Sequence, residues 1–429
     1  MGGDTTTVAT VTVLVGMVAT TGFDGLGVML GSIVGVLLFL VLVVEPLRAH
    51  ASLTAPDLLD ARGSGGSGVR VAWGVVTLLV CFLAGRAVGG RRECGRCRAR
   101  AAGARTGCIV VIGCVMTALA VSGGIRGTGV VMIVKSAIAL PVLIVAAFLV
   151  LHRFGGDLGR LLDAAATGSG AGEAFLQPGG YTGDGWVGAV NRVGQIFGMT
   201  MATLAMPAVL MRAIATKSPR GARIVGRWML GELVVLYGAL AVVGVGAAAL
   251  VGGVLREAGP SAQVFTPLLL GRALDDGGLL VAALACVLFL TALAAVVDVT
   301  LAAGITLGRD VLAAASGDRL AGRLDGTASR WSAALTGLAA AAVAVVCADW
   351  NLVVISTLWL ALCGAALAPV LLYALYWPGF TARGALWCLW GATAVCVVAL
   401  AVSPYASGTP TSIWPGHDFR LWDVTIPGW

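Results

Sequence analysis

The dominant pattern along the chain is a recurrence of apolar runs, most of them about 20 residues long, separated by short polar stretches. At 1.5 Å per residue, a helix of that length crosses a hydrocarbon core of ~30 Å. We therefore expect an all-α, polytopic membrane protein. The pattern predicts about eleven transmembrane helices, over residues 5–22, 25–45, 69–88, 107–124, 129–151, 195–212, 227–253, 279–305, 331–348, 351–376 and 384–402.

The composition supports a membrane location. Hydrophobic residues make up 59% of the chain and charged residues only 11%, whereas a typical soluble domain has about 25% charged residues. The net charge of +7 comes from basic residues in short loops, which is typical of membrane topology and does not indicate a nucleic-acid partner. The chain thus predicts a multi-pass protein of the plasma membrane, surrounded by the lipid bilayer.

Loop charges predict the orientation of the chain. With a cytoplasmic N-terminus, the inside loops hold most loop cations, as the positive-inside rule requires. These cations are Arg48, Arg62, Arg126, Arg212, Lys217, Arg220, Arg223, Arg227, Arg309, Arg319, Arg323, Arg330 and Arg383. One loop disagrees: the arginine-rich segment 86–105 lies outside in this scheme.

The arginine-rich loop also contains Cys94 and Cys97 in a CxxC spacing. A zinc site would need two more ligands, and His50, His152 and His417 are all remote in the sequence. We interpret the segment as a basic hydrophilic loop. The sequence contains no combination of nucleophile, base and metal ligands, so we expect no enzyme activity, no metal site and no cofactor apart from a transported cation.

One acidic residue, Asp298, lies near the middle of the apolar stretch 289–310. A carboxylate at that depth costs about 2.5–3.5 kcal/mol, so its side chain should face the bundle interior, a partner or water. Helical spacing places Thr291, Ala294 and Ala295 on the same face. We predict that this face is the ion-coupling side of a secondary transporter.

Three interpretations of Asp298 remain open. The carboxyl group could carry a proton, because burial disfavours the charged form. It could instead be a structural partner of Arg309, Lys135 or backbone donors, or it could face water without either role. For Lys135 we expect a position near the cytoplasmic surface, with the amine extended to the interface.

Hydroxyl groups gather at two further places. The first predicted helix begins with Thr5, Thr6, Thr7, Thr10 and Thr12. These hydroxyls either bond back to the preceding turn or line a polar cavity. The sixth helix carries Thr200 and Thr203 shortly before Pro207, which removes a backbone donor. Interrupted helices of this kind form transporter sites near the middle of the membrane.

Several short motifs together resemble one family. They are GFDGLG at 22–27, EPLR at 45–48, TAPD at 54–57, GGIRGT at 123–128, PAVLMR at 207–212, the stretch 289–310, AP at 368–369, YW at 376–377 and TARGA at 381–385. In this order and spacing, the chain resembles the sodium:solute symporter family. Within that family it is most similar to the acetate permease branch of cation/monocarboxylate symporters.

The resemblance implies a five-plus-five inverted-repeat transporter fold, with the site between broken helices 1 and 6. The transmembrane domain would span residues 1–405, with a first repeat at about 5–151, a second at about 195–376 and an extra helix at about 384–402. Residues 406–429 would form a polar tail. Relatives usually carry more helices at each end, so we expect a shortened member of the family.

The ion site departs from the resemblance. Sodium-using relatives usually have a hydroxyl pair at the positions of Ala294 and Ala295, and a methyl group cannot coordinate sodium. Thr291 retains one oxygen, while Asp298 adds a carboxylate where the family tends to have glycine. Ala208 replaces a histidine of the acetate permeases. The coupling cation could therefore be a proton or sodium.

We expect a symporter that moves a small organic anion, a monocarboxylate such as acetate, by alternating access. The predicted ion-coupling residues are Thr6, Thr291, Ala294, Ala295 and Asp298. The predicted substrate-binding residues are Thr7, Thr10, Thr200 and Thr203. The alternative is a non-transporting scaffold, sensor or partner subunit that keeps the fold but has lost the ion site.

Overall fold

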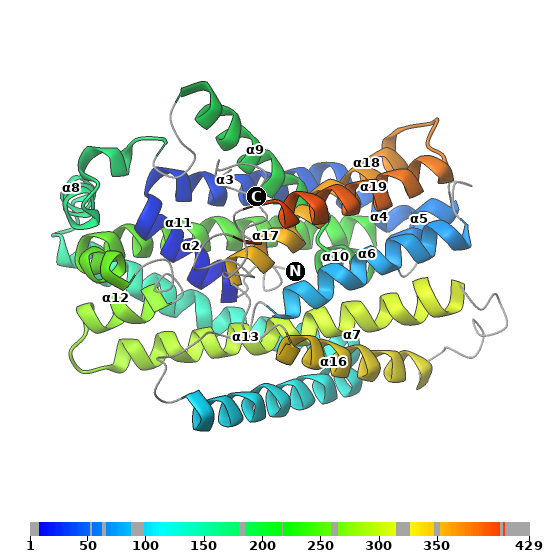
Figure 1. Cartoon of the computed structure of the whole chain (residues 1–429), viewed down its shortest axis with the longest axis horizontal. Coiled ribbons are helices and arrows are strands. Elements are labelled where there is room, and N and C mark those ends of the chain that lie inside the picture. Colours follow the sequence, from blue (N-terminus) through cyan, green and yellow to red (C-terminus); the bar gives the residue numbers. More distant parts are fainter. Residues whose placement is uncertain are drawn as a thin grey trace.

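The structure, a computed structural model, is almost entirely helical over the residues that it describes (Figure 1). These are residues 8–51, 54–61, 66–86, 98–179, 185–216, 218–258, 265–314, 327–346, 352–403 and 406–407. Within these ranges, eight helices are long and apolar enough to cross a membrane, and shorter apolar helices cover Thr10–Thr21, Gly113–Gly124 and Trp331–Ala340. Each of the eleven predicted helices corresponds to one of these segments. The all-α, polytopic prediction is thus confirmed.

The chain forms its helices in the following order. The first half comprises α2 (Val8–Thr21), α3 (Phe23–Leu38), the π-helical turn η1 (Phe39–Val43), α4 (Val44–His50), α5 (Pro56–Ala61), α6 (Ser67–Arg86), α7 (Arg98–Arg153), α8 (Leu158–Ser169) and the short η2 (Gly172–Leu176). The second half comprises α9 (Gly185–Leu204), α10 (Pro207–Ile214), α11 (Pro219–Ala258), α12 (Thr266–Leu274), α13 (Leu279–Ile305), η4 (Thr306–Ala313), α16 (Thr327–Val346), α17 (Leu352–Leu362), η5 (Cys363–Leu367), α18 (Ala368–Tyr376) and α19 (Ala382–Ala401).

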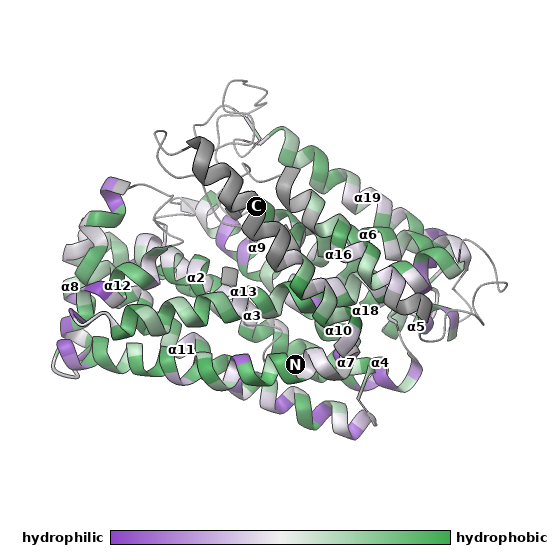
Figure 2. Cartoon of the chain, turned by 90° about the horizontal axis from the view of Figure 1, so that it is seen from below, coloured by the Kyte–Doolittle hydropathy of each residue, from purple (hydrophilic) through white to green (hydrophobic). Residues whose placement is uncertain are grey.

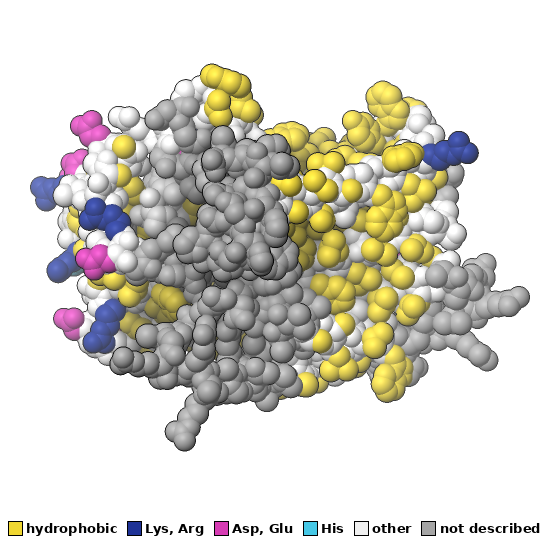
Figure 3. All heavy atoms as spheres, in the orientation of Figure 1, with side chains coloured by type: hydrophobic (Ala, Val, Ile, Leu, Met, Phe, Trp, Pro, Cys, Tyr) yellow, Lys and Arg dark blue, Asp and Glu magenta, His cyan; other side chains and the backbone are white. Residues whose placement is uncertain are grey.

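The long helices lie side by side along one axis (Figure 1). Apolar residues line most of their length, and hydrophilic residues gather towards the two ends of the bundle (Figure 2). On the face drawn in Figure 3, the charged side chains of the described residues likewise lie near the ends. Large apolar side chains such as Ile133 and Val193 are about 70% exposed along the sides. This distribution suits a bundle whose flanks contact lipid.

The fourth and fifth predicted helices meet at a single residue. Both belong to α7, which is kinked at Gly124 with φ 53° and ψ −157°. That backbone conformation is open to glycine but strained for a residue with a Cβ atom. The stretch from Ile125 is already helical, so the expected loop between the two helices is reduced to this kink.

A break in the sixth span separates α9 from α10. Ala205 and Met206 interrupt the helix, and Met206 has an extended ψ of 121°. Pro207 causes this geometry, because proline disfavours the helical region for the residue before it and is tolerated at the first position of a new helix. The predicted interruption at Pro207 is confirmed.

A polar turn sets the start of α13. Asp275 accepts hydrogen bonds from the backbone N–H groups of Leu280 and Gly277, both at 2.9 Å. These donors, Leu280 foremost, lower the pKa of the Asp275 carboxyl group. Gly278 completes the turn with φ 76°. The helix therefore begins beside a carboxylate, which the positive end of the helix dipole favours.

Helices α3 and α9 pack along a seam of small residues. A Cβ atom on Gly35 would lie 2.7 Å from the backbone oxygen of Thr200 and 2.8 Å from the Cβ atom of Thr203. A Cβ atom on Gly31 would lie 2.8 Å from the backbone oxygen of Ile196. The glycines thus allow the two backbones to approach closely, as small residues do in membrane bundles.

The seam predicts the effect of a single methyl group. Gly35→Ala should lower the free energy of unfolding by about 1–3 kcal/mol, because the new Cβ atom meets a backbone oxygen that cannot move aside. Unfolding titrations in detergent micelles measure the change. Gly231→Ala in α11 is the control, since no atom lies within 4 Å of its added Cβ. Equal stability of the two variants would contradict this packing.

Candidate functional site

The acidic face of the eighth span lies inside the bundle. Asp298 lies near the middle of the span Leu279–Ala313 and is 7% exposed. Thr291 and Ala294 are fully buried, and Ala295 is 9% exposed. The face therefore looks into protein, as the cost of a carboxylate in lipid led us to expect.

The partner of Asp298 comes from the half-helix after the break. Arg212 of α10 donates from Nη2 to Oδ1 of Asp298 at 2.5 Å. The arginine side chain is 11% exposed and the aspartate side chain 8% exposed. The sequence had suggested Arg309, Lys135 or backbone donors as partners, and among the described residues the structure pairs Asp298 with Arg212 instead. The contact spans 86 residues of chain, so helical spacing on α13 did not reveal it.

The expectation for Lys135 was wrong. Its side chain does not extend to the interface but is among the largest fully buried side chains, at 2% exposure. Lys135 lies on α7, which packs extensively against α13. Which face of a helix is buried depends on the helices that pack against it. The prediction rested on the charge of Lys135 alone, and a long charged side chain usually extends to the surface.

Four helices meet around the Arg212–Asp298 pair. Cys81 of α6 is buried and lies close enough to Asp298 for an electrostatic interaction between the two side chains. Gly129 of α7 faces the arginine, because a Cβ atom there would lie 3.6 Å from Nη1. Met211 and Val299, which are next to Arg212 and Asp298 in the sequence, belong to a small apolar cluster. Its members are Leu78, Cys81, Met211, Val299, Ala302 and Ala303.

The physical consequence is a strongly coupled pair of charges. In an apolar, weakly screening environment, both groups lose hydration, and their mutual contact offsets part of that loss. Removing one partner leaves the other charge desolvated. The pair therefore ties α10 to α13 as long as both groups are ionised.

The predicted threonines fall into separate places. Thr200 and Thr203 lie in the seam with α3, where Thr200 donates to the backbone oxygens of Ile196 (2.8 Å) and Gly31 (3.0 Å). Thr203 donates to Met199 O at 2.8 Å. Thr10 is half-buried on α2, while Thr6 and Thr7 lie outside the described residues. The structure thus brings Thr291, Ala294 and Ala295 together with Asp298, but places Thr200 and Thr203 against another helix.

Hydrogen bonding limits what these threonines can bind. Thr291 donates its hydroxyl to Val287 O at 2.8 Å and to Leu288 O at 2.9 Å. Because the hydroxyl protons of Thr200, Thr203 and Thr291 point to carbonyl oxygens, these side chains present lone pairs. A lone pair can coordinate a cation, but it cannot donate a hydrogen bond to a carboxylate.

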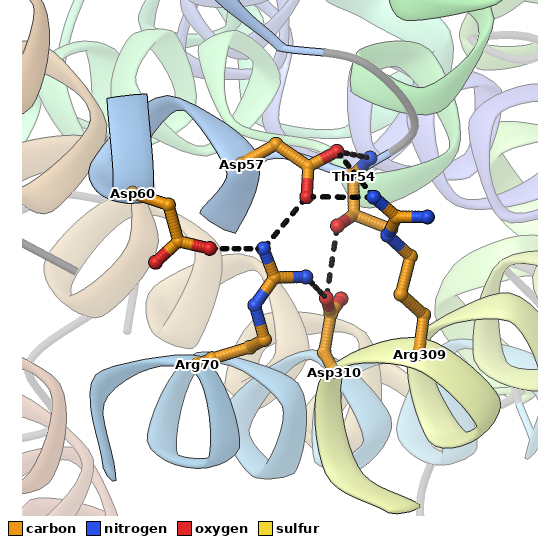
Figure 4. A network of polar contacts seen from close by, with 6 residues as sticks. All are labelled: Thr54, Asp57, Asp60, Arg70, Arg309 and Asp310. Carbon is orange, nitrogen blue, oxygen red and sulfur yellow. Dashed lines mark hydrogen bonds and ion pairs between the residues drawn. The ribbon is translucent and has the colours of Figure 1, made fainter. Parts of the chain in front are cut away.

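A second charged cluster lies at one end of α13. Arg70 of α6 bonds Asp57 at 2.7 Å and Asp310 at 3.1 Å, and it also contacts Asp60 (Figure 4). Thr54 donates its hydroxyl to Asp310 at 2.8 Å. Arg309 contacts Asp57 at 3.3 Å. We call Thr54, Asp57, Asp60, Arg70, Arg309 and Asp310 the end network.

The end network connects three segments that the sequence pattern treated separately. It joins the stretch around α5, the start of α6 and the π-helical end of the α13 span (Figure 4). Within α5, Asp57, Leu58 and Leu59 are buried. Asp57, Arg309 and Asp310 stood inside the family motifs, but Arg70, which links Asp57 to Asp310, lies in none of them.

The described residues contain no group of three or more His, Cys, Asp or Glu placed to hold a metal ion. Cys94 and Cys97 of the basic loop lie outside the described residues.

Comparisons with known proteins agree with this architecture. The sequence matches the model of the sodium:solute symporter family over residues 3–392. It is 27% identical to the "Monocarboxylic acid transporter" of Corynebacterium glutamicum, covering 100% of this chain and 80% of that protein. It is 26% identical to the "Uncharacterized symporter YwcA" of Bacillus subtilis, covering 90% and 74% of the two chains.

A solved structure shares the fold. It is a Na⁺-coupled sialic acid symporter in a substrate-bound outward-open state, with a TM-score of 0.62 and 12% sequence identity. The match covers 93% of this chain and 81% of that chain. The expected inverted-repeat transporter fold is therefore confirmed.

The end network predicts a large loss of stability when its central cation is removed. Arg70→Met should lower the free energy of unfolding by about 3–5 kcal/mol, because Asp57 and Asp310 then remain desolvated without that partner. Arg160→Met is the matched control, since its ion pair with Asp157 is exposed and screened by solvent. Unfolding titrations of both variants in micelles measure the difference, and equal losses would rule out a structural role for Arg70.

Proposed function

The chain belongs to the sodium:solute symporter family, and on this premise we propose that it is a proton-coupled symporter of a small monocarboxylate. It is a multi-pass protein of the plasma membrane, and its named relatives are transporters and not enzymes. A family member of this kind has a solute and a cation as its substrates. The proposal concerns which solute and which cation these are.

The substrate class is supported by a relative and by chemistry. The matching protein of Corynebacterium glutamicum is named a monocarboxylic acid transporter, and the match covers the whole of this chain. A guanidinium group buried in the bundle is the residue type best suited to a carboxylate, because its planar donors match two carboxylate oxygens. Acetate and pyruvate are small members of that class.

The observation that carries the choice of cation is the buried Arg212–Asp298 pair. It joins the half-helix behind the α9–α10 break to α13, and broken helices are the elements that rearrange in transporters of this architecture. When the two groups separate, an ionised Asp298 is left in apolar surroundings, which favours binding of a proton. When they close again, the proton is released.

Sodium is the less suitable cation on this face. It needs several oxygen ligands, as hard cations generally do. Ala294 and Ala295 present methyl groups beside Asp298, and Thr291 supplies one hydroxyl oxygen. A single proton needs only the carboxylate.

The remaining predicted residues take supporting roles in this proposal. Thr6, Thr7 and Thr10 stay proposed contacts of the substrate or ion on the first helix. Thr200 and Thr203 lie in the seam between α3 and the sixth span. Their hydroxyl lone pairs there suit a cation and not an anion. The repeats at about 5–151 and 195–376 would move against each other around the break in alternating access.

The non-transporting alternative is favoured by the same two alanines, because they remove ligands from the family's ion site. It predicts a protein that moves neither solute nor cation across the membrane. A transport measurement separates it from the symporter.

Reconstituted vesicles test the proposed function. Uptake of labelled pyruvate should exceed equilibrium when the outside is acidic, and an inward sodium gradient should add little. Pyruvate is preferred to acetate as the probe because undissociated acetic acid crosses lipid unaided. Asp298→Asn should abolish accumulation, since an amide cannot bind and release the proton, whereas exposed Asp163→Asn on α8 should leave it unchanged.

Protein-free vesicles correct for passive entry in this measurement. Accumulation driven by sodium alone would contradict proton coupling. A lack of accumulation under either gradient, for pyruvate and for lactate, would favour the non-transporting alternative.

A further inference from the structure

We propose that Arg212 is the receptor for the carboxylate of the substrate, and that Asp298 occupies this receptor while substrate is absent. The inference rests on the proposed function and assigns the specificity-determining residue of the same site. It makes the Arg212–Asp298 pair a resting state in which one side chain imitates the transported anion.

The geometry of the pair supports this assignment. Nη2 of Arg212 donates to Oδ1 of Asp298, which is the charge-assisted contact that a guanidinium group makes with a carboxylate. A substrate carboxylate would make the same contact with the same nitrogen. Gly129 of α7 places no side chain against the neighbouring Nη1 atom. The contact at Nη2 is therefore the position that a substrate carboxylate would take over from Asp298.

The surroundings suit a short acyl chain. The sequence neighbours of the pair, Met211 and Val299, belong to one apolar cluster with uncharged side chains of α6 and α13, namely Leu78, Ala302 and Ala303. A small amphiphilic ligand binds where apolar side chains surround a few polar groups that fix its orientation. These five residues carry no charge, which suits the apolar part of a short-chain monocarboxylate.

The exchange balances in charge and in protons. The resting pair consists of guanidinium and carboxylate, and the incoming species are one carboxylate anion and one proton. After exchange, the substrate carboxylate lies on Arg212 and the proton lies on the Asp298 carboxyl group. The net charge of the site is zero before and after, so no uncompensated charge is left in an apolar region.

The neighbouring titratable groups fit this scheme. Arg212 on α10 faces Asp298 directly, Cys81 on α6 lies close to it, and the buried Lys135 is on α7, which packs against α13. The proton can enter with each anion because the displaced carboxylate of Asp298 loses its cation at that moment. The coupling of one proton to one anion thus follows from competition for a single arginine.

Exchange experiments without any gradient test the inference. Vesicles loaded with unlabelled pyruvate report binding through the half-saturation of labelled pyruvate exchange. For the wild type, affinity should rise about tenfold for each unit that pH falls, since one proton binds with one anion. In Asp298→Asn the internal competitor is gone, so the half-saturation concentration should fall roughly tenfold and lose its pH dependence between pH 6 and 8.

Two further variants separate anion binding from folding. Arg212→Gln combined with Asp298→Asn removes both charges and retains two hydrogen-bonding amides, so it should keep a melting temperature near that of the wild type. It should show no saturable pyruvate exchange at any pH. Arg212→Lys keeps the charge but loses the planar fork, and it should weaken affinity about tenfold while the pH dependence remains.

The outcomes distinguish this inference from the proposed function. Saturable exchange by the doubly neutral variant, or a pH-independent wild type, would overturn the role of Arg212 while leaving a monocarboxylate symporter in place. Weaker pyruvate binding by Asp298→Asn than by the wild type would also overturn it, because removing an internal competitor cannot weaken the binding of the substrate. Absence of any pyruvate or lactate exchange by the wild type would overturn the proposed function itself.

Discussion

The structure depends on one constraint: a charge inside an apolar bundle must be neutralised where it lies. Arg212 and Asp298 meet this constraint with a 2.5 Å contact between α10 and α13. Placing either side chain in lipid, or burying either one without the other, would cost stability. The pair therefore imposes a specific arrangement on two helices that the chain leaves free to move, since α10 is separated from α9 by a break.

The α13 span carries a second charged centre at its end. Asp310 follows Asp298 on the same continuous helix, roughly 18 Å further along its axis at the usual rise per residue. There the end network joins Asp310 to α5 and α6 through Arg70 and Thr54. One helical span therefore carries both the Arg212–Asp298 pair and part of the end network.

Rigid and adjustable contacts are distributed differently in the bundle. The α3–α9 seam brings backbones together through Gly31 and Gly35, and such packing tolerates little displacement. The contact between α10 and α13 is instead an ion pair between the side chains of Arg212 and Asp298. A transporter of the sodium:solute symporter family needs both kinds of contact, since alternating access moves one group of helices against a fixed one.

The sequence by itself determined the eleven helical segments, the interruption at Pro207 and the burial of the Asp298 face. These features follow from local causes, namely apolar length, the missing N–H group of proline and the spacing of residues on a helix. Only the tertiary structure decided that Arg212 faces Asp298, that Lys135 is buried and that Asp57 meets Arg70. Those contacts join residues on different helices, and their geometry depends on how the helices cross, which no local pattern along one segment contains.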